Sequence, residues 1–251
     1  MRRAPLALAL AALPMLAGQP LVYQDGTTRL AGYVARPDGM KGNAPGVLIV
    51  HQWMGVTGHE RMIADKLAGL GYVSVAADVY GEGVRPKDMK EAAAQAGMYK
   101  NDRALYRRRV RAGLDALKAQ PGVDPARLAV IGFCFGGMGA LDAARTGLPV
   151  VAVVSFHGDL TPGPDGGAAI QAKVLVCHGA DDPNVPPPAV AGFQDEMRKA
   201  KADYNFIAYG GAVHSFTQKE AGNDNSKGAA YNEAAARRSW QHMRDLFAEV
   251  F

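Results

Sequence analysis

The chain has 251 residues, of which 48% are hydrophobic and 21% charged, as in ordinary globular proteins. This composition excludes a wholly disordered chain and a coiled coil. The net charge of +4, from 28 basic and 24 acidic residues, is too small to indicate a nucleic-acid partner, and the 2 cysteines cannot form a disulfide scaffold. Outside the N-terminus there is no run of about 18 apolar residues, so we expect no membrane span.

Residues 1–18 are typical of an export signal. Arg2-Arg3 give a charged start, residues 6–16 are apolar, and a small-residue cleavage site lies near Ala17-Gly18. Two prolines and a methionine within the segment depart from the usual pattern, which leaves open an uncleaved N-terminal extension. We expect a periplasmic or secreted protein if the segment is cleaved, and a cytoplasmic one otherwise.

Buried strands alternate with helices along the rest of the chain. Residues 21–24 and 29–35 flank Asp25-Gly26, a hairpin turn signal, so the first two strands should pair antiparallel. The later elements are strands at 46–50, 72–77, 128–133, 150–156, 174–177 and 204–209, and helices at 58–70, 101–119 and 227–250. The later strands are continuous apolar runs, as expected for a parallel sheet that is covered on both faces. No linker or repeat interrupts the pattern, which predicts a single domain over residues 19–251.

Four arginines cluster on the helix predicted at 101–119: Arg107, Arg108, Arg109 and Arg111. An anion site is one interpretation of this cluster. We favour the simpler one, a solvated basic face of the helix.

The strand at 128–133 runs directly into a glycine-rich turn, Gly132-Phe133-Cys134-Phe135-Gly136-Gly137. The spacing is that of the G-x-S-x-G nucleophile elbow, with cysteine in place of serine. Such a turn strains the backbone of its central residue, and the glycines on either side avoid a clash. The thiol of Cys134 then lies at a helix N-terminus, which favours a thiolate, and the Phe135 N–H is placed for an oxyanion. The alternative is a buried cysteine in a tight turn.

An acid and a histidine follow this turn in the order that a nucleophile elbow requires. Asp181 and Asp182 come after the strand predicted at 174–177, and His214 comes after the strand at 204–209. The pattern predicts that Cys134 attacks a carbonyl carbon, that His214 takes the thiol proton and later activates water, and that an aspartate orients the imidazole.

On these motifs the chain resembles the dienelactone hydrolase family of α/β-hydrolases, over nearly all of residues 20–251. The segments that carry the resemblance are His51-Gln52-Trp53-Met54-Gly55, Asp78-Val79-Tyr80-Gly81, the Cys134 turn, residues 179–186 and His214-Ser215-Phe216. The resemblance implies an α/β-hydrolase fold and a triad of Cys134, Asp182 and His214. It also implies that the backbone N–H of Trp53 is the second oxyanion donor. We expect no cofactor and no metal.

Three positions depart from the family members that cleave dienelactones. Those enzymes carry a glutamate, which contacts the resting thiol, where this chain has Gln52. They also carry two arginines that hold the substrate carboxylate, at the positions of Glu82 and Gln218. The anion clamp is therefore missing, although Arg85 and Lys219 are candidates to replace it. The resemblance thus predicts the reaction type better than the substrate.

Three further histidines, His51, His157 and His178, also follow buried strands. Together with His214 they raise the question of a metal site, but no H-x-x-x-H or C-x-x-C spacing supports one. We expect His51 and His157 to line the substrate pocket. Cys177 lies within a strand and is predicted to be a buried, inert thiol.

The sequence therefore predicts a hydrolase of carboxylic esters or lactones that works through a thioester acyl-enzyme on a small molecule. We expect a monomer or dimer. Acyl transfer to an alcohol or thiol is an alternative, as are a non-catalytic binding protein on the same scaffold and a thiol-redox protein. The complete Cys–Asp–His set favours an enzyme over a binding protein, and the lack of a C-x-x-C motif disfavours the redox interpretation.

Overall fold

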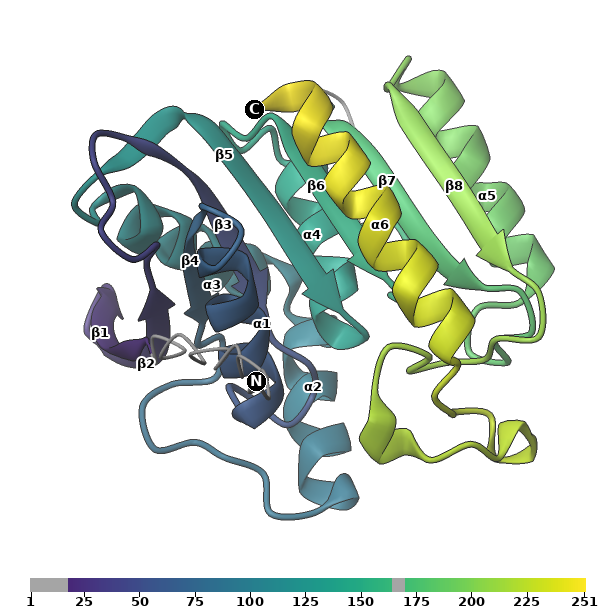
Figure 1. Ribbon diagram of the computed structural model, residues 1–251. Helices are drawn as coiled ribbons and strands as arrows, with labels where there is room; N and C mark the ends of the chain where they lie inside the picture. The colour runs from purple at the N-terminus through teal and green to yellow at the C-terminus, as the bar shows by residue number, and fades with distance from the viewer. Residues whose placement is uncertain (1–17, 164–169) are drawn as a thin grey trace, which may run out of the picture.

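The computed structural model describes residues 18–163 and 170–251 (Figure 1). Its centre is one 8-stranded sheet with the strand order β1-β2-β4-β3-β5-β6-β7-β8. The strands are β1 (Gln19–Asp25), β2 (Thr28–Ala35), β3 (Ala44–Val50), β4 (Val73–Ala77), β5 (Val123–Phe133), β6 (Ala152–Phe156), β7 (Lys173–Gly179) and β8 (Tyr204–Tyr209). β1 pairs antiparallel with β2, as does β2 with β4, and the other neighbouring pairs are parallel. The predicted N-terminal hairpin and mostly parallel sheet are confirmed. Of the predicted export signal, only Gly18 lies within the described residues.

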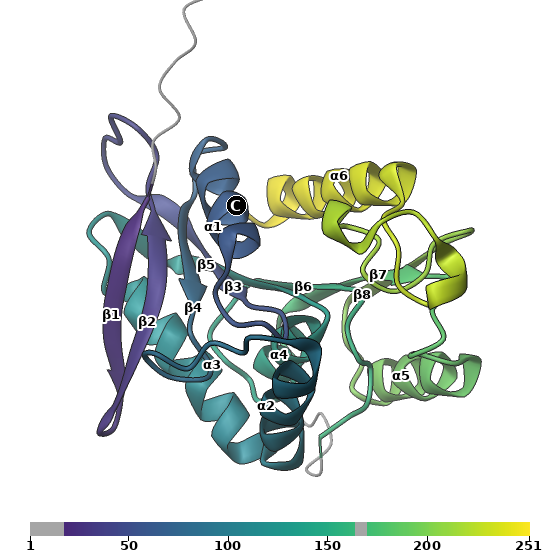
Figure 2. The same ribbon diagram turned by 90° about the horizontal axis from the view of Figure 1, so that it is seen from below.

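Helices cover both faces of the sheet, as predicted (Figure 2). They are α1 (Gly58–Ala68), α2 (Met89–Asn101), α3 (Arg103–Lys118), α4 (Phe135–Arg145), α5 (Pro187–Lys199) and α6 (Glu233–Val250). α1 and α6 lie on one face, where Leu67 and Phe247 are fully buried, and the other four helices lie on the opposite face. Each face has its own apolar core, so burial of apolar surface holds both helix layers on the sheet.

Two predicted helix boundaries were wrong, and in both cases a capping side chain sets the true boundary. The helix expected at 101–119 begins at Arg103, because the Asp102 side chain accepts a hydrogen bond from the Leu105 N–H. The helix expected at 227–250 begins only at Glu233, where the Asn232 side chain accepts from the Ala235 N–H. Helices α2 and α5 were not predicted.

The parallel strands end at the same edge of the sheet, which brings together residues that are far apart in sequence. Val50 of β3 pairs with Gly132 of β5, and Phe156 of β6 lies between Phe133 of β5 and Cys177 of β7. The residues that follow these strand ends therefore meet at the carboxyl edge of the sheet, where ligands of open α/β sheets bind.

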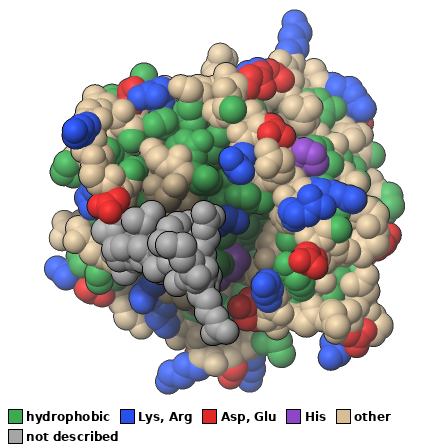
Figure 3. All heavy atoms as spheres, in the orientation of Figure 1, with side chains coloured by type: hydrophobic (Ala, Val, Ile, Leu, Met, Phe, Trp, Pro, Cys, Tyr) green, Lys and Arg blue, Asp and Glu red, His purple; other side chains and the backbone are tan. Residues whose placement is uncertain are grey.

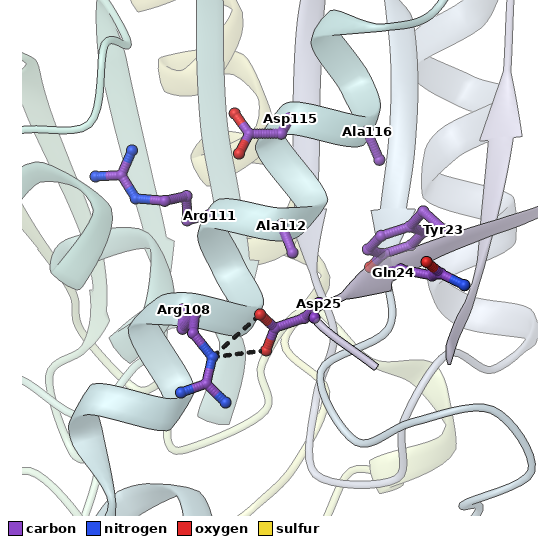
Figure 4. A pocket seen from close by; sticks show the side chains of 9 residues that line it. Tyr23, Gln24, Asp25, Arg108, Arg111, Ala112, Asp115 and Ala116 are labelled. Carbon is purple, nitrogen blue, oxygen red and sulfur yellow. Dashed lines mark hydrogen bonds and ion pairs between the residues drawn. The ribbon is translucent and has the colours of Figure 1, made fainter. Parts of the chain in front are cut away.

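The arginine cluster of α3 is only in part the solvated basic face that we predicted, because Arg108 and Arg111 are exposed but the other two arginines are not. Arg109 is buried and its guanidinium lies 2.8 Å from Asp25 Oδ2. Arg108 contacts the same carboxylate (Figure 4), and Arg107 lies 3.2 Å from the buried Asp142. The cluster therefore ties α3 to the β1–β2 hairpin and to α4.

Candidate active site

Cys134 lies in the sharp turn between β5 and α4, at the carboxyl edge of the sheet. Its φ of 54° is positive, a conformation that side chains rarely adopt. The glycines of the turn are required by space: a Cβ on Gly132 would lie 1.9 Å from Gly136 O, and a Cβ on Gly136 would lie 2.1 Å from Val50 O. The thiol is half-buried at the N-terminus of α4.

His214 and Asp182 lie in line with this thiol. His214 Nε2 is 3.1 Å from Cys134 Sγ, and His214 Nδ1 is 2.9 Å from Asp182 Oδ2. The second carboxylate oxygen of Asp182 accepts a hydrogen bond from the Asn184 N–H at 2.8 Å, which orients the side chain. Asp181 turns away and accepts from the Gly211 N–H. The three residues predicted as a set are therefore brought together, with Asp182 as the acidic partner.

The surroundings of His214 favour its charged form. Burial alone disfavours the imidazolium, but the hydrogen bonds to Asp182 and Cys134 outweigh burial and raise the pKa of His214 to about 10. The imidazole can therefore hold a proton beside the sulfur at neutral pH.

Backbone strain gathers at this place. Among the described residues, the non-glycine residues with positive φ are Cys134, His157, Lys201 and Ser215. All but Lys201 lie at the site or next to His214. Strained conformations persist where the surrounding structure enforces them, which is typical of functional sites.

The two backbone N–H groups predicted as oxyanion donors belong to Trp53 and Phe135. Tyr80 donates its hydroxyl proton to Trp53 O, and Tyr106 donates to Phe135 O, both at 2.8 Å. Both tyrosines are buried, and burial raises the pKa of each phenol well above its usual value. These supporting roles could not be predicted from the sequence, because Tyr106 belongs to an apolar helix stripe and shows no separate signal.

His157 is a support for this turn and not a pocket residue, contrary to our expectation. Its side chain is fully buried, and Nδ1 accepts from the Cys134 N–H at 3.2 Å. Nε2 lies 2.8 Å from the Thr217 hydroxyl, in the loop that carries His214. Burial, and then the charge of His214, lower the pKa of His157 well below its usual value, so the ring stays neutral.

The other predicted pocket residues divide into two groups. His51 is fully buried with both ring nitrogens on backbone atoms, and Glu82 is paired with Arg29 at 2.6 Å; neither lines the cavity that Gln52 and Gln218 share. The Arg85 guanidinium lies on the carbonyls of Ala31, Gly81 and Val84 and 3.4 Å from Asp78. Arg85 therefore does not replace the missing clamp in this structure.

Gln52 and Gln218 do line a common cavity. It has a volume of about 380 Å³ and is also lined by Trp53, Met54 and Glu220. The Gln218 amide nitrogen is buried and has no hydrogen-bond partner among the described residues. A second cavity, of about 650 Å³, opens between α1 and α6 on the face shown in Figure 3, and both apolar and charged side chains line it.

Cys177 is fully buried, and burial raises the pKa of its thiol to about 12, so the prediction of a buried thiol is confirmed. Within residues 18–163 and 170–251, no three His, Cys, Asp or Glu side chains are grouped so that they would hold a metal ion. No helix in the same part of the chain is long and apolar enough to cross a membrane.

The strand order, the two helix layers and the sharp turn after β5 define an α/β-hydrolase. The chain belongs to the dienelactone hydrolase family, whose model matches residues 30–251, and it is therefore a hydrolase. A solved structure described as a dienelactone hydrolase-like promiscuous phosphotriesterase from metagenomic libraries is 43% identical. The match covers 93% of this chain and 98% of the chain in that structure, with a TM-score of 0.89.

Two relatives extend the comparison. A proposed carboxymethylenebutenolidase of Synechocystis is 28% identical over 236 residues, which is 87% of this chain and 91% of that protein. An uncharacterized protein of Caenorhabditis elegans is 39% identical over 146 residues, which is 57% of this chain and 92% of that protein. Family membership and the similarity to the Synechocystis protein support cleavage of an ester or lactone.

Proposed function

We propose that this protein hydrolyses neutral carboxylic esters or lactones through a thioester intermediate on Cys134. The observation that carries the proposal is the line of contacts from Asp182 through His214 to the sulfur, at 2.9 Å and 3.1 Å. Family membership supports the reaction type, and the geometry of these residues supports the mechanism.

In the first half-reaction the Cys134 sulfur attacks the carbonyl carbon, and the thiol proton resides on His214. The oxyanion that forms is held by the N–H groups of Trp53 and Phe135. As the C–O bond breaks, the imidazolium gives its proton to the leaving alkoxide, and a thioester remains on Cys134.

In the second half-reaction a water molecule replaces the alcohol. His214 takes a proton from this water, the hydroxide attacks the thioester carbon, and the C–S bond breaks to release the acid. The proton returns to the Cys134–His214 pair. Asp182 holds the ring in the required orientation throughout and stabilises its charged form. Transfer of the acyl group to an alcohol in place of water follows the same steps and is the alternative outcome.

The substrate class follows from the charges near the site. Glu82 is paired with Arg29, Arg85 is engaged with carbonyls, and Gln218 is uncharged. Neither Arg85 nor the positions of Glu82 and Gln218 therefore offer a free cation to a substrate carboxylate, and desolvating an unpaired carboxylate is costly. We expect neutral esters to be better substrates than lactones with a free carboxylate.

The test is hydrolysis of short-chain nitrophenyl esters by the wild type, Cys134→Ala and Cys177→Ala. Cys134→Ala should lose activity while it keeps the circular dichroism spectrum of the wild type. Cys177→Ala is the matched control, because it removes the other thiol, and it should stay active. Full activity in Cys134→Ala would refute the proposal. Trapping a wild-type acyl-enzyme by mass spectrometry would support the thioester directly.

The same assay tests the substrate class. A neutral ester and a lactone of similar size that bears a free carboxylate are compared by kcat/KM. We expect at least about a tenfold preference for the neutral compound, which corresponds to about 1.4 kcal/mol. A preference for the carboxylated lactone would show that a cation holds the substrate after all.

A further inference from the structure

The peptide between Gln52 and Trp53 is bonded on one side only. Its carbonyl oxygen, on Gln52, contacts Nδ1 of the His51 ring. Its N–H, on Trp53, has no hydrogen-bond partner among the described residues. This free N–H is one of the two donors to which the proposed function assigns the oxyanion.

The contacts of His51 determine which ring nitrogen carries the proton. The Val79 N–H points to Nε2 at 3.1 Å, and a backbone N–H can only donate, so Nε2 must be unprotonated. The Gln52 carbonyl can only accept, so Nδ1 must carry the proton. The ring is fully buried between Tyr80 and Phe135, with ring centroids at 4.6 Å and 5.9 Å. Burial lowers the pKa of His51, which keeps this neutral tautomer.

We infer that His51 is a positioning residue for the oxyanion site, and that it acts through the Gln52–Trp53 peptide. The inference rests on the proposed function. The hydrogen bond from Nδ1–H fixes the plane of the peptide and therefore the direction of the Trp53 N–H. It also withdraws electron density from the carbonyl, which makes the N–H at the other end of the peptide a stronger donor.

The neighbouring side chains hold other peptides of this loop. The buried Glu60 carboxylate accepts from the Gln52 N–H at 3.3 Å and from the Thr57 N–H at 2.8 Å. Tyr80 holds the Trp53 carbonyl, which belongs to the next peptide along the chain. The Gln52 carbonyl also accepts from the Gly55 N–H at 3.1 Å, so among the described residues His51 is the one side chain that donates to the peptide carrying the free N–H.

Two substitutions separate the two bonds of His51. The amide nitrogen of asparagine takes the place of Nδ1, so His51→Asn keeps a donor for the Gln52 carbonyl and loses the acceptor for Val79. The amide oxygen of glutamine takes the place of Nε2, so His51→Gln keeps the acceptor and loses the donor.

An oxyanion contact is made more strongly in the transition state than in the ground state. In His51→Gln we therefore expect kcat for the nitrophenyl ester to fall about ten- to hundredfold with KM little changed. In His51→Asn the loss should stay below about threefold.

The rate of Cys134 alkylation by iodoacetamide is the second readout. If the role of His51 were merely structural, its substitution would lower this rate and kcat together. This reaction forms a C–S bond and expels iodide, and no oxyanion develops. Cys134 in His51→Gln should therefore alkylate at the wild-type rate while its kcat is reduced. Equal loss of kcat in the two variants, or a parallel loss of alkylation and kcat, would overturn the inference.

A measurement on the unaltered protein covers the case in which the variants do not fold. The ¹⁵N spectrum of the His51 ring should show a single neutral tautomer with its proton on Nδ1. A proton on Nε2 would overturn the inference. A wild type that hydrolysed no ester would refute the proposed function. An active wild type whose kcat does not change in His51→Gln would refute only the inference about His51.

Discussion

His214 is the residue whose charge depends most on its neighbours. In the unfolded chain its pKa has the ordinary value of about 6.5, whereas in the folded protein Asp182 and Cys134 raise the pKa to about 10 against the effect of burial. A group whose pKa is raised by folding stabilises the fold while it is protonated. This contribution is complete below about pH 6.5 and is lost as the pH rises towards 10.

Asp182→Asn should therefore destabilise the protein in a pH-dependent way. Loss of the carboxylate removes a main cause of the raised pKa of His214, so the variant should unfold at a lower temperature than the wild type at pH 6. The gap between the two melting temperatures should narrow at pH 10, where His214 is losing its proton in the wild type also. Melting curves at pH 6, 8 and 10 measure the gap. A gap that widens with pH would contradict this assignment.

At the scale of elements, the turn from β5 into α4 sets the position of the site. The strand end and the helix approach so closely that Gly132 and Gly136 leave no room for a methyl group. The first turn of α1 is held in a comparable way by Thr57 and Glu60, which form a capping box. Both helix N-termini are thus fixed by local contacts next to the residues that carry the chemistry.

Alanine substitution of two glycines tests this tight approach. Gly136→Ala should cost more than about 2 kcal/mol and abolish ester hydrolysis, because the new Cβ would lie 2.1 Å from Val50 O. Gly97→Ala in α2 is the control, since a Cβ there meets nothing within 4 Å. It should stabilise the helix by about 0.5–1 kcal/mol. Urea unfolding with an ester assay reports both quantities. Wild-type stability in Gly136→Ala would show that the elbow can widen.

At the scale of the whole molecule, the first described residue is attached to the fold. The Gly18 N–H donates to Asp65 Oδ1 of α1 at 2.9 Å, and Tyr33 donates to the same oxygen. A Cβ at residue 18 would lie 2.4 Å from Val34 O, so the position requires glycine. Cleavage between Ala17 and Gly18 would place a positively charged N-terminus beside the Asp65 carboxylate.

We therefore predict that residues 1–17 are removed on export and that the exported protein begins at Gly18. Mass spectrometry of the protein from its native host should give the mass of residues 18–251, in the periplasmic or secreted fraction. Asp65→Asn should destabilise the shortened protein more than the full-length chain, because only the former has the charged amine. An intact Met1 on protein from the cytoplasm would reject the prediction.

The residues at the strand ends could be predicted from the sequence because their positions depend on local pattern. A continuous apolar run predicts a buried strand, and the glycine spacing around Cys134 predicts the turn that follows β5. Parallel strands end at one edge, so His214 and an aspartate after β7 could be placed beside this turn without coordinates, and the family resemblance selected Asp182. The sheet and its two helix layers follow from the same alternation of apolar segments.

Only the tertiary structure decided what each side chain at this edge contacts. His51, His157 and His214 all follow buried strands, and in sequence they look equivalent. Each ring also has a partner that is distant in sequence: Val79 lies 28 residues from His51, and Thr217 lies 60 residues from His157. The direction of a ring depends on such long-range contacts, which local periodicity does not contain. The same reason explains why the sequence indicated Glu82 and Arg85 as pocket residues, whereas the fold directs them to Arg29 and to backbone carbonyls.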